Sequence, residues 1–130
     1  MSEADASDES LPATGVAVGI VFGVGIAATA AALFGGSIAI TAGYGAGGGL
    51  VVGALTGRLA DANRGQDEWA IRVIGGGAAL GLAVGLVLGT LLVWSWGDPT
   101  LNGLLVGCLG GFVTGLLVGS VLVANERAKE

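Results

Sequence analysis

Four long apolar runs dominate the pattern of the chain. The first two follow one another without a charged side chain, from Leu11 to Gly57. This stretch is about twice the ~20 residues that cross a bilayer as a helix, so the chain is expected to turn back within it. The third run covers residues 70–94 and the fourth covers residues 101–124. Because the runs are continuous, and because a bilayer offers no water to free amide groups, the pattern predicts four transmembrane helices.

Small residues between the runs predict where the chain turns. Gly35, Gly36 and Ser37 form the expected turn between helices at 12–34 and 37–57. The expected fold class is an all-α integral membrane protein whose four helices form two tandem helical hairpins. The expected segments are an acidic, disordered cytoplasmic tail at 1–11, a first transmembrane hairpin at 12–57, a cytoplasmic linker at 58–69, a second transmembrane hairpin at 70–124 and a cytoplasmic tail at 125–130.

The basic residues predict the orientation of the spans. With four spans, both tails and the linker lie on one side of the membrane. Positive charge is retained in the cytoplasm, so both termini are expected to be cytoplasmic in a multi-pass protein of the cell (plasma) membrane. These segments, or the first turn of the run that follows, contain every basic residue of the chain: Arg58, Arg64, Arg72, Arg127 and Lys129.

Three tryptophans and one arginine mark the expected membrane interfaces. Trp69 lies at the cytoplasmic end of the third run, and Trp94 and Trp96 lie near its other end. Tryptophan prefers the two headgroup regions, which suits both positions. Arg72 lies about one turn inside the run, and its long side chain can extend back to the headgroups. We therefore predict these four residues to be interface anchors.

The two halves of the chain repeat at an offset of 62 residues. Gly15 corresponds to Gly77 and Gly53 to Gly115, and this register continues without a gap through both helices of each half. Each half contains an even number of spans, so two copies would share one orientation. The expected relation between the hairpins is therefore parallel, about an axis near the membrane normal.

Glycines four residues apart are the main physical signal in this repeat. Such residues lie on one face of a helix and let the backbone of another helix approach closely. Close approach stabilises helix association in lipid through van der Waals contact, so we predict glycine-zipper (GxxxG) packing. The predicted helix-packing residues are Gly15, Gly19, Gly23, Gly45, Gly49, Gly53, Gly57, Gly77, Gly81, Gly85, Gly89, Gly103, Gly107, Gly111, Gly115 and Gly119.

Two resemblances to known families follow from these motifs. The doubled, glycine-striped arrangement resembles the proteolipid ring subunits of rotary ATP synthases, which need a carboxylate in an outer helix; residues 101–124 contain none. Thr41 to Gly45 (TAGYG) resembles the potassium-channel filter TVGYG, whose backbone carbonyls replace the hydration shell of the ion. The equivalent segment of the second half, 103–107, reads GLLVG, as in an ordinary apolar helix.

The composition narrows the expected chemistry. Only 12% of residues are charged, the net charge is −5, there is no histidine, and Cys108 is the single cysteine. These residues provide no nucleophile–base pair, no metal-ligand spacing and no basic patch for nucleic acid. We therefore expect no enzymatic activity, no cofactor, no metal and no nucleic-acid partner. One Lys and four Arg beside ten acidic residues indicate a prokaryotic source.

The spans lack the ionisable residues that mark ion and proton pathways in membranes. We therefore expect a structural, assembly or accessory subunit that docks helices through its glycine faces. Its expected partners are the lipid bilayer and either copies of itself or another membrane protein. The alternative that remains is an oligomeric channel or facilitator for a small solute or ion, which would use backbone carbonyls and hydroxyls.

Overall fold

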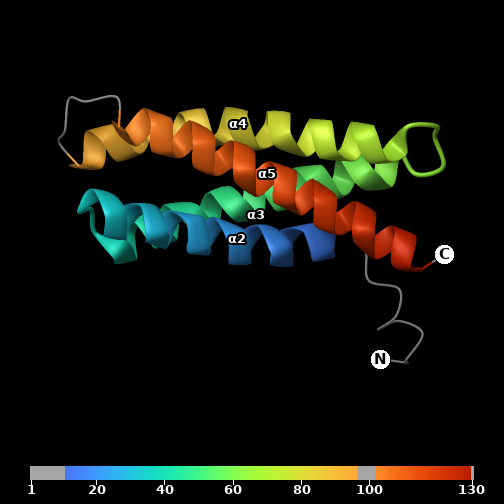
Figure 1. Cartoon of the computed structure of the whole chain (residues 1–130), viewed down its shortest axis with the longest axis horizontal. Helices are drawn as coiled ribbons and strands as arrows, with labels where there is room; N and C mark the ends of the chain where they lie inside the picture. The colour runs from blue at the N-terminus through green and yellow to red at the C-terminus, as the bar shows by residue number, and fades with distance from the viewer. Residues whose placement is uncertain (1–10, 97–101, 130) are drawn as a thin grey trace.

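The computed structural model describes residues 11–96 and 102–129, which form four long helices (Figure 1). These are α2 (Leu11–Phe34), α3 (Ile38–Ala62), α4 (Trp69–Trp96) and α5 (Asn102–Ala128). Each is long and apolar enough to cross a membrane, so the prediction of an all-helical chain with four such helices is confirmed. The expected acidic tail lies outside the described residues except for Leu11, as does most of the polar segment between α4 and α5.

The turn between α2 and α3 falls at the predicted residues for clear backbone reasons. Gly35 has φ +77°, a left-handed conformation that glycine adopts without a steric cost. The next amide, of Gly36, donates to the carbonyl of Ala31 at 3.0 Å, which satisfies one of the last free carbonyls of α2. Ser37 then begins α3 as its N-cap, where its side chain accepts from the amide of Ile40 at 3.5 Å.

Two helices extend further than the apolar runs that predicted them. α3 continues to Ala62, past the expected end at Gly57, and Asn63 closes it by donating from its amide side chain to the carbonyl of Leu59 at 2.8 Å. α5 continues to Ala128 instead of ending at Ala124. Helical structure therefore occupies part of the predicted linker and tail, because a helix ends where its backbone is capped and not where its apolar surface ends.

The helices associate as two antiparallel pairs, α2 with α3 and α4 with α5, which lie side by side (Figure 1). The two pairs meet where α3 contacts α4, where α2 contacts α5, and where α3 contacts α5 across the centre. α3 and α5 are therefore the central helices of the bundle.

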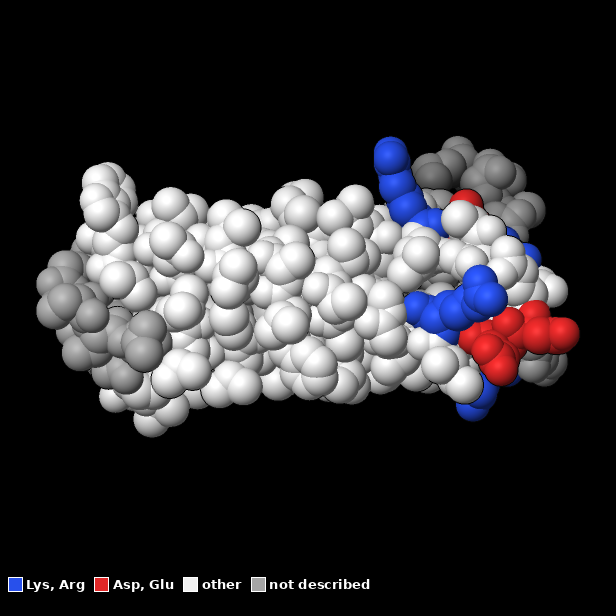
Figure 2. All heavy atoms as spheres, turned by 90° about the horizontal axis from the view of Figure 1, so that it is seen from above, with Lys and Arg blue, Asp and Glu red and all other residues white. Residues whose placement is uncertain are grey.

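The two ends of the bundle differ in charge and in packing. In Figure 2 the charged side chains gather at one end, which we call the charged end; it contains the start of α2 and α4 and the end of α3 and α5. A cluster of buried side chains fills the centre of the bundle close to this end and draws on all four helices. Its members are Leu11, Ala60, Val73, Val118, Leu122 and Val123.

Candidate functional site

The backbones of α2 and α3 approach most closely at paired glycines. A Cβ atom built on Gly19 would overlap the carbonyl oxygen of Gly49, and one on Gly15 would overlap the carbonyl oxygen of Gly53. The relation is reciprocal, because a Cβ on Gly49 would overlap the carbonyl oxygen of Gly19. No side chain larger than hydrogen fits at these positions without moving a backbone.

The second helix pair repeats this geometry. A Cβ on Gly81 would overlap the carbonyl oxygen of Gly111, and one on Gly85 would overlap that of Gly107. Gly115 lies against Gly77, with the built Cβ 2.7 Å from the carbonyl carbon. The structure places all sixteen glycines named from the sequence where an added Cβ would lie within 3.0 Å of an atom of the neighbouring helix.

Three further glycines, which the sequence reasoning did not select, receive side chains across the junction between the two helix pairs. Gly48 of α3 receives Leu88 of α4, and Gly110 of α5 receives Ile26 of α2. Gly76 of α4 receives Leu59 of α3. These glycines lie outside the selected four-residue stripes. The correspondence of Gly48 with Gly110 at the 62-residue offset is a signal for those two, whereas Gly76 corresponds to Thr14 and has no such signal.

The contacts of Gly48 and Gly110 are equivalent at that offset. Gly48 precedes Gly110 by 62 residues, and Ile26 precedes Leu88 by 62 residues. The contact between Gly48 and Leu88 therefore has the contact between Gly110 and Ile26 as its counterpart, with the two halves exchanged. Exchange of this kind is what a two-fold axis between two similar units produces.

The residues predicted to anchor the interfaces have different environments. Trp69 is half-buried, and its indole N–H donates to the carbonyl oxygen of Ala60 at 2.7 Å, which joins the start of α4 to the end of α3. Arg72 is exposed and donates to the side chain of Gln66 at 3.1 Å, so it extends back towards the charged end. Trp94 is 82% exposed near the opposite end, and Trp96 is the last residue of α4.

The resemblance of residues 41–45 to a potassium-channel filter does not extend to the backbone structure. Residues 41–45 lie inside α3, where the segment is α-helical. A filter needs an extended strand of backbone whose carbonyl oxygens point into a pore, whereas carbonyl oxygens in a helix accept the amides four residues later.

Four hydroxyl groups within the helices bond to the backbone of their own helix. Thr29, Thr90, Thr114 and Ser120 each donate to the carbonyl oxygen four residues earlier, at 2.7–2.9 Å. Thr41 and Thr56, both on α3 and 1% and 0% exposed, differ because their hydroxyl oxygens are buried without a hydrogen-bond partner. A buried hydroxyl without a partner costs about 1–3 kcal/mol, so each is a candidate position for a bound polar atom.

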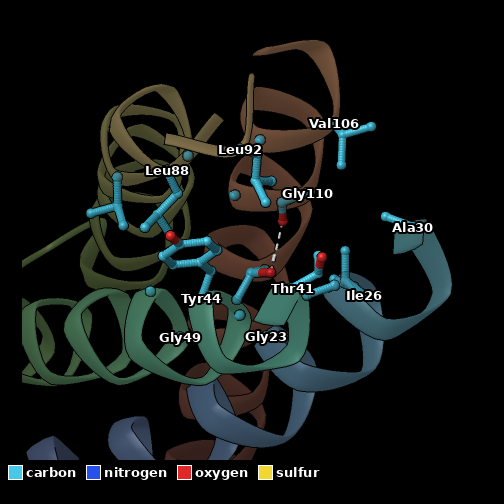
Figure 3. A pocket seen from close by; sticks show the side chains of 18 of the residues that line it. Gly23, Ile26, Ala30, Thr41, Tyr44, Gly49, Leu88, Leu92, Val106 and Gly110 are labelled. Atoms are coloured by element: carbon cyan, nitrogen blue, oxygen red, sulfur yellow. Dashed lines mark hydrogen bonds between the residues drawn. The ribbon is translucent and has the colours of Figure 1, made fainter. Parts of the chain in front are cut away.

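Thr41 lines a cavity of about 60 Å³ in the half of the bundle away from the charged end. We call it the inner cavity; all four helices contribute to its wall, which is predominantly apolar. Figure 3 shows Tyr44 and Leu88 towards one side of the cavity and Ala30 and Val106 at the other, with Thr41 between Tyr44 and Ile26. Its volume exceeds the ~10–15 Å³ that a single water molecule requires.

Charged side chains at the charged end form ion pairs with one another. Arg64 lies 3.6 Å from Glu126 and 3.9 Å from Asp61, and Lys129 lies 3.1 Å from the same Glu126. Within residues 11–96 and 102–129, no three His, Cys, Asp or Glu side chains gather where they could hold a metal ion. Cys108 is a half-buried free thiol.

No protein-family model, curated protein or solved structure matches this chain.

Proposed function

We propose that the chain is a membrane protein built from two tandem, parallel-oriented hairpins, 12–57 and 70–124, each closed by glycine-zipper packing. The observation that carries this proposal is the approach of backbone to backbone at the glycines, in the same register in both halves. The exchanged contacts of Gly48 and Gly110 support a two-fold relation between the hairpins. Packing of this kind needs no polar partner and is stable in a bilayer.

For its role, we propose that the protein is a non-catalytic structural or accessory subunit of a larger membrane assembly. The sixteen glycines predicted to pack helices all contact another helix of the same chain, so they are not available to a partner protein. A separate face of α3 contains Gly43 and Gly47, which are exposed and have nothing within 4 Å of a built Cβ. A helix of a second copy or of another membrane protein can approach this face closely.

We also propose the orientation and location of the protein. The charged end contains all five basic residues, which supports its placement in the cytoplasm with both termini, in the plasma membrane. The exposed apolar side chains along the helices are suited to lipid contact. They include Val21, Leu33, Ile71 and Val87, at 60–75% exposure.

Gentle extraction of the tagged protein tests the accessory role. We expect it to purify with a membrane partner at fixed stoichiometry. Gly47→Leu should lose this partner while remaining folded, because nothing lies within 4 Å of a Cβ built at this exposed position. Gly75→Leu is the matched control, since Gly75 of α4 is equally open but lies on another helix. A monomer with no partner from any extraction would contradict the proposal.

The alternative function, an oligomeric channel or facilitator, is favoured by one observation. The inner cavity contains the unpartnered Thr41 hydroxyl within the bundle, where a small solute could be held. A symmetric homo-oligomer that conducts a small solute in liposomes would support this alternative and displace the accessory role.

A further inference from the structure

An open crevice lies between α2 and α5 on the membrane-facing side of the bundle. It runs along α2 from Val21 to Phe34 and along α5 from Leu105 to Val113, with a volume of about 610 Å³ and apolar walls. We call it the α2–α5 crevice. It adjoins the inner cavity, because residues such as Ala30 and Val106 line both.

Two residues of α2 that line the crevice are smaller than their counterparts in α4. Gly25 and Ala30 line it, and the residues 62 positions later are Val87 and Leu92. The contact between α3 and α4 is the counterpart of the contact between α2 and α5. There Leu92 is 4% exposed and lines the inner cavity, where it occupies space that Ala30 leaves empty on the other side. The two halves of the chain therefore differ in side-chain volume at Ala30, where the crevice meets the inner cavity, and at its counterpart Leu92.

The crevice is long enough along α2 for an acyl chain that spans one leaflet of a bilayer. Thirteen residues separate Val21 from Phe34, and at 1.5 Å per residue this segment of α2 is about 20 Å long. The hydrocarbon core is about 30 Å thick, so one leaflet contributes about 15 Å. The crevice begins near the middle of α2, so the ~15 Å of one leaflet extends from Val21 to about Ala31, and the last turn of α2 lies at the level of the polar part of the lipid.

Thr41 lies at the depth of the polar part of such a lipid. Gly45 of α3 is level with Gly23 and Ala27 of α2, because a Cβ built on Gly45 would overlap atoms of both. Thr41 lies one helical turn closer to the end of the bundle, about one turn inside the last residues of α2. Its hydroxyl is buried without a partner at the wall of the inner cavity, next to the crevice.

We propose that the α2–α5 crevice binds a membrane lipid specifically. One acyl chain lies along the crevice between α2 and α5. An oxygen atom at the glycerol level of the lipid passes between Ala30 and Val106 and accepts a hydrogen bond from Thr41. The lipid supplies the hydrogen-bond partner that the chain itself does not provide for this hydroxyl.

Photolabelling with a phosphatidylcholine that carries a diazirine in one acyl chain tests this proposal in purified, full-length protein. Labelled residues, mapped by mass spectrometry, should concentrate at 21–34 and 105–113. Gly25→Leu should reduce labelling there to the level of the other helix faces, because its side chain enters open space in the crevice. Gly75→Leu, which adds the same side chain outside the crevice, should leave the pattern unchanged.

Titration of the same lipid into protein in detergent tests the contribution of Thr41. Thr41→Val keeps the side-chain shape and should raise the apparent Kd about fivefold, the loss expected for one neutral hydrogen bond. Thr56→Val is the matched control, since Thr56 is also buried and unpartnered on α3 but, unlike Thr41, does not line the inner cavity. Uniform labelling of the wild type, or an unchanged pattern in Gly25→Leu, would overturn the crevice as the site. An unchanged Kd in Thr41→Val, or an equal loss in Thr56→Val, would overturn the hydrogen bond.

Discussion

At the scale of single residues, glycine has two opposite energetic effects in this chain. Inside a helix it is less favourable than alanine by about 0.5–1 kcal/mol, because it loses more backbone freedom on folding. At Gly115 the missing Cβ compensates for this cost, since a Cβ there would overlap the carbonyl oxygen of Gly77. At Gly75 nothing lies within 4 Å of a built Cβ, so only the unfavourable effect remains.

The same substitution should therefore change stability in opposite directions at these two positions. Gly115→Ala forces two backbones apart and should destabilise the protein by about 1–3 kcal/mol, the usual cost of overpacking. Gly75→Ala should stabilise it by about 0.5–1 kcal/mol through helix propensity. Thermal unfolding in detergent measures both changes. A decrease in Tm for both variants, or for neither, would contradict the assigned contacts.

At the scale of helices, the end of α3 shows how a helix in this bundle terminates. Its last carbonyl groups have no amide partners within the helix and need others. Asn63 provides two for the carbonyl of Leu59, from its backbone at 3.1 Å and from its side chain at 2.8 Å. Trp69, from the start of α4, provides one for the buried Ala60. The hydrogen bond from Trp69 to Ala60 therefore caps the end of α3 and also links α3 to α4.

Loss of the indole donor should weaken this junction. Trp69→Phe keeps an aromatic ring but leaves the carbonyl of Ala60 without that donor, which should cost about 1–3 kcal/mol in the free energy of unfolding. Trp94→Phe serves as the control because Trp94 is 82% exposed and should change stability little. Chemical or thermal unfolding of the two variants under one condition makes the comparison. Equal effects would mean that the hydrogen bond contributes nothing.

Hydropathy and local sequence preferences predicted where the helices lie. They did not predict where the helices end or where cavities form between them. The four helices and the turn at Gly35 followed from long apolar runs and local backbone preferences. The end of α3 at Ala62 did not, because Arg58 ends the apolar run whereas the cap comes later, at Asn63. The inner cavity was also missed, since it depends on how Ala30 and Thr41 meet residues from distant helices. The glycine-zipper packing and the parallel hairpins stay predictions.

At the scale of the whole molecule, all charged residues among those described lie at one end. The opposite end contains the turn at residues 35–37, the end of α4 and the start of α5. A protein with this distribution has a single orientation favoured by the positive-inside rule. The proposed orientation places Asn63 in the cytoplasm and Ser37 outside.

Accessibility of introduced cysteines measures this orientation. After Cys108→Ala, a cysteine at Ser37 should react with a membrane-impermeant maleimide in intact cells. A cysteine at Asn63 should react only after the membrane is opened. A cysteine at Asp98, which lies outside the described residues, should behave like the one at Ser37. Reaction of Asn63 in intact cells would reverse the orientation, and opposite results for Ser37 and Asp98 would exclude four spans.

The short turn between α2 and α3 has a consequence for how the protein enters the membrane during synthesis. Only Gly35, Gly36 and Ser37 separate the two helices, so inserting them together carries no charged side chain across the hydrocarbon. Each charge placed at the centre of a span would cost about 2.5–3.5 kcal/mol on insertion scales. The first two helices can therefore enter as one unit from the side where the ribosome works. The pair of α2 and α3 can be in the membrane before α4 leaves the ribosome. Its surface is then already formed when α4 and α5 pack against it.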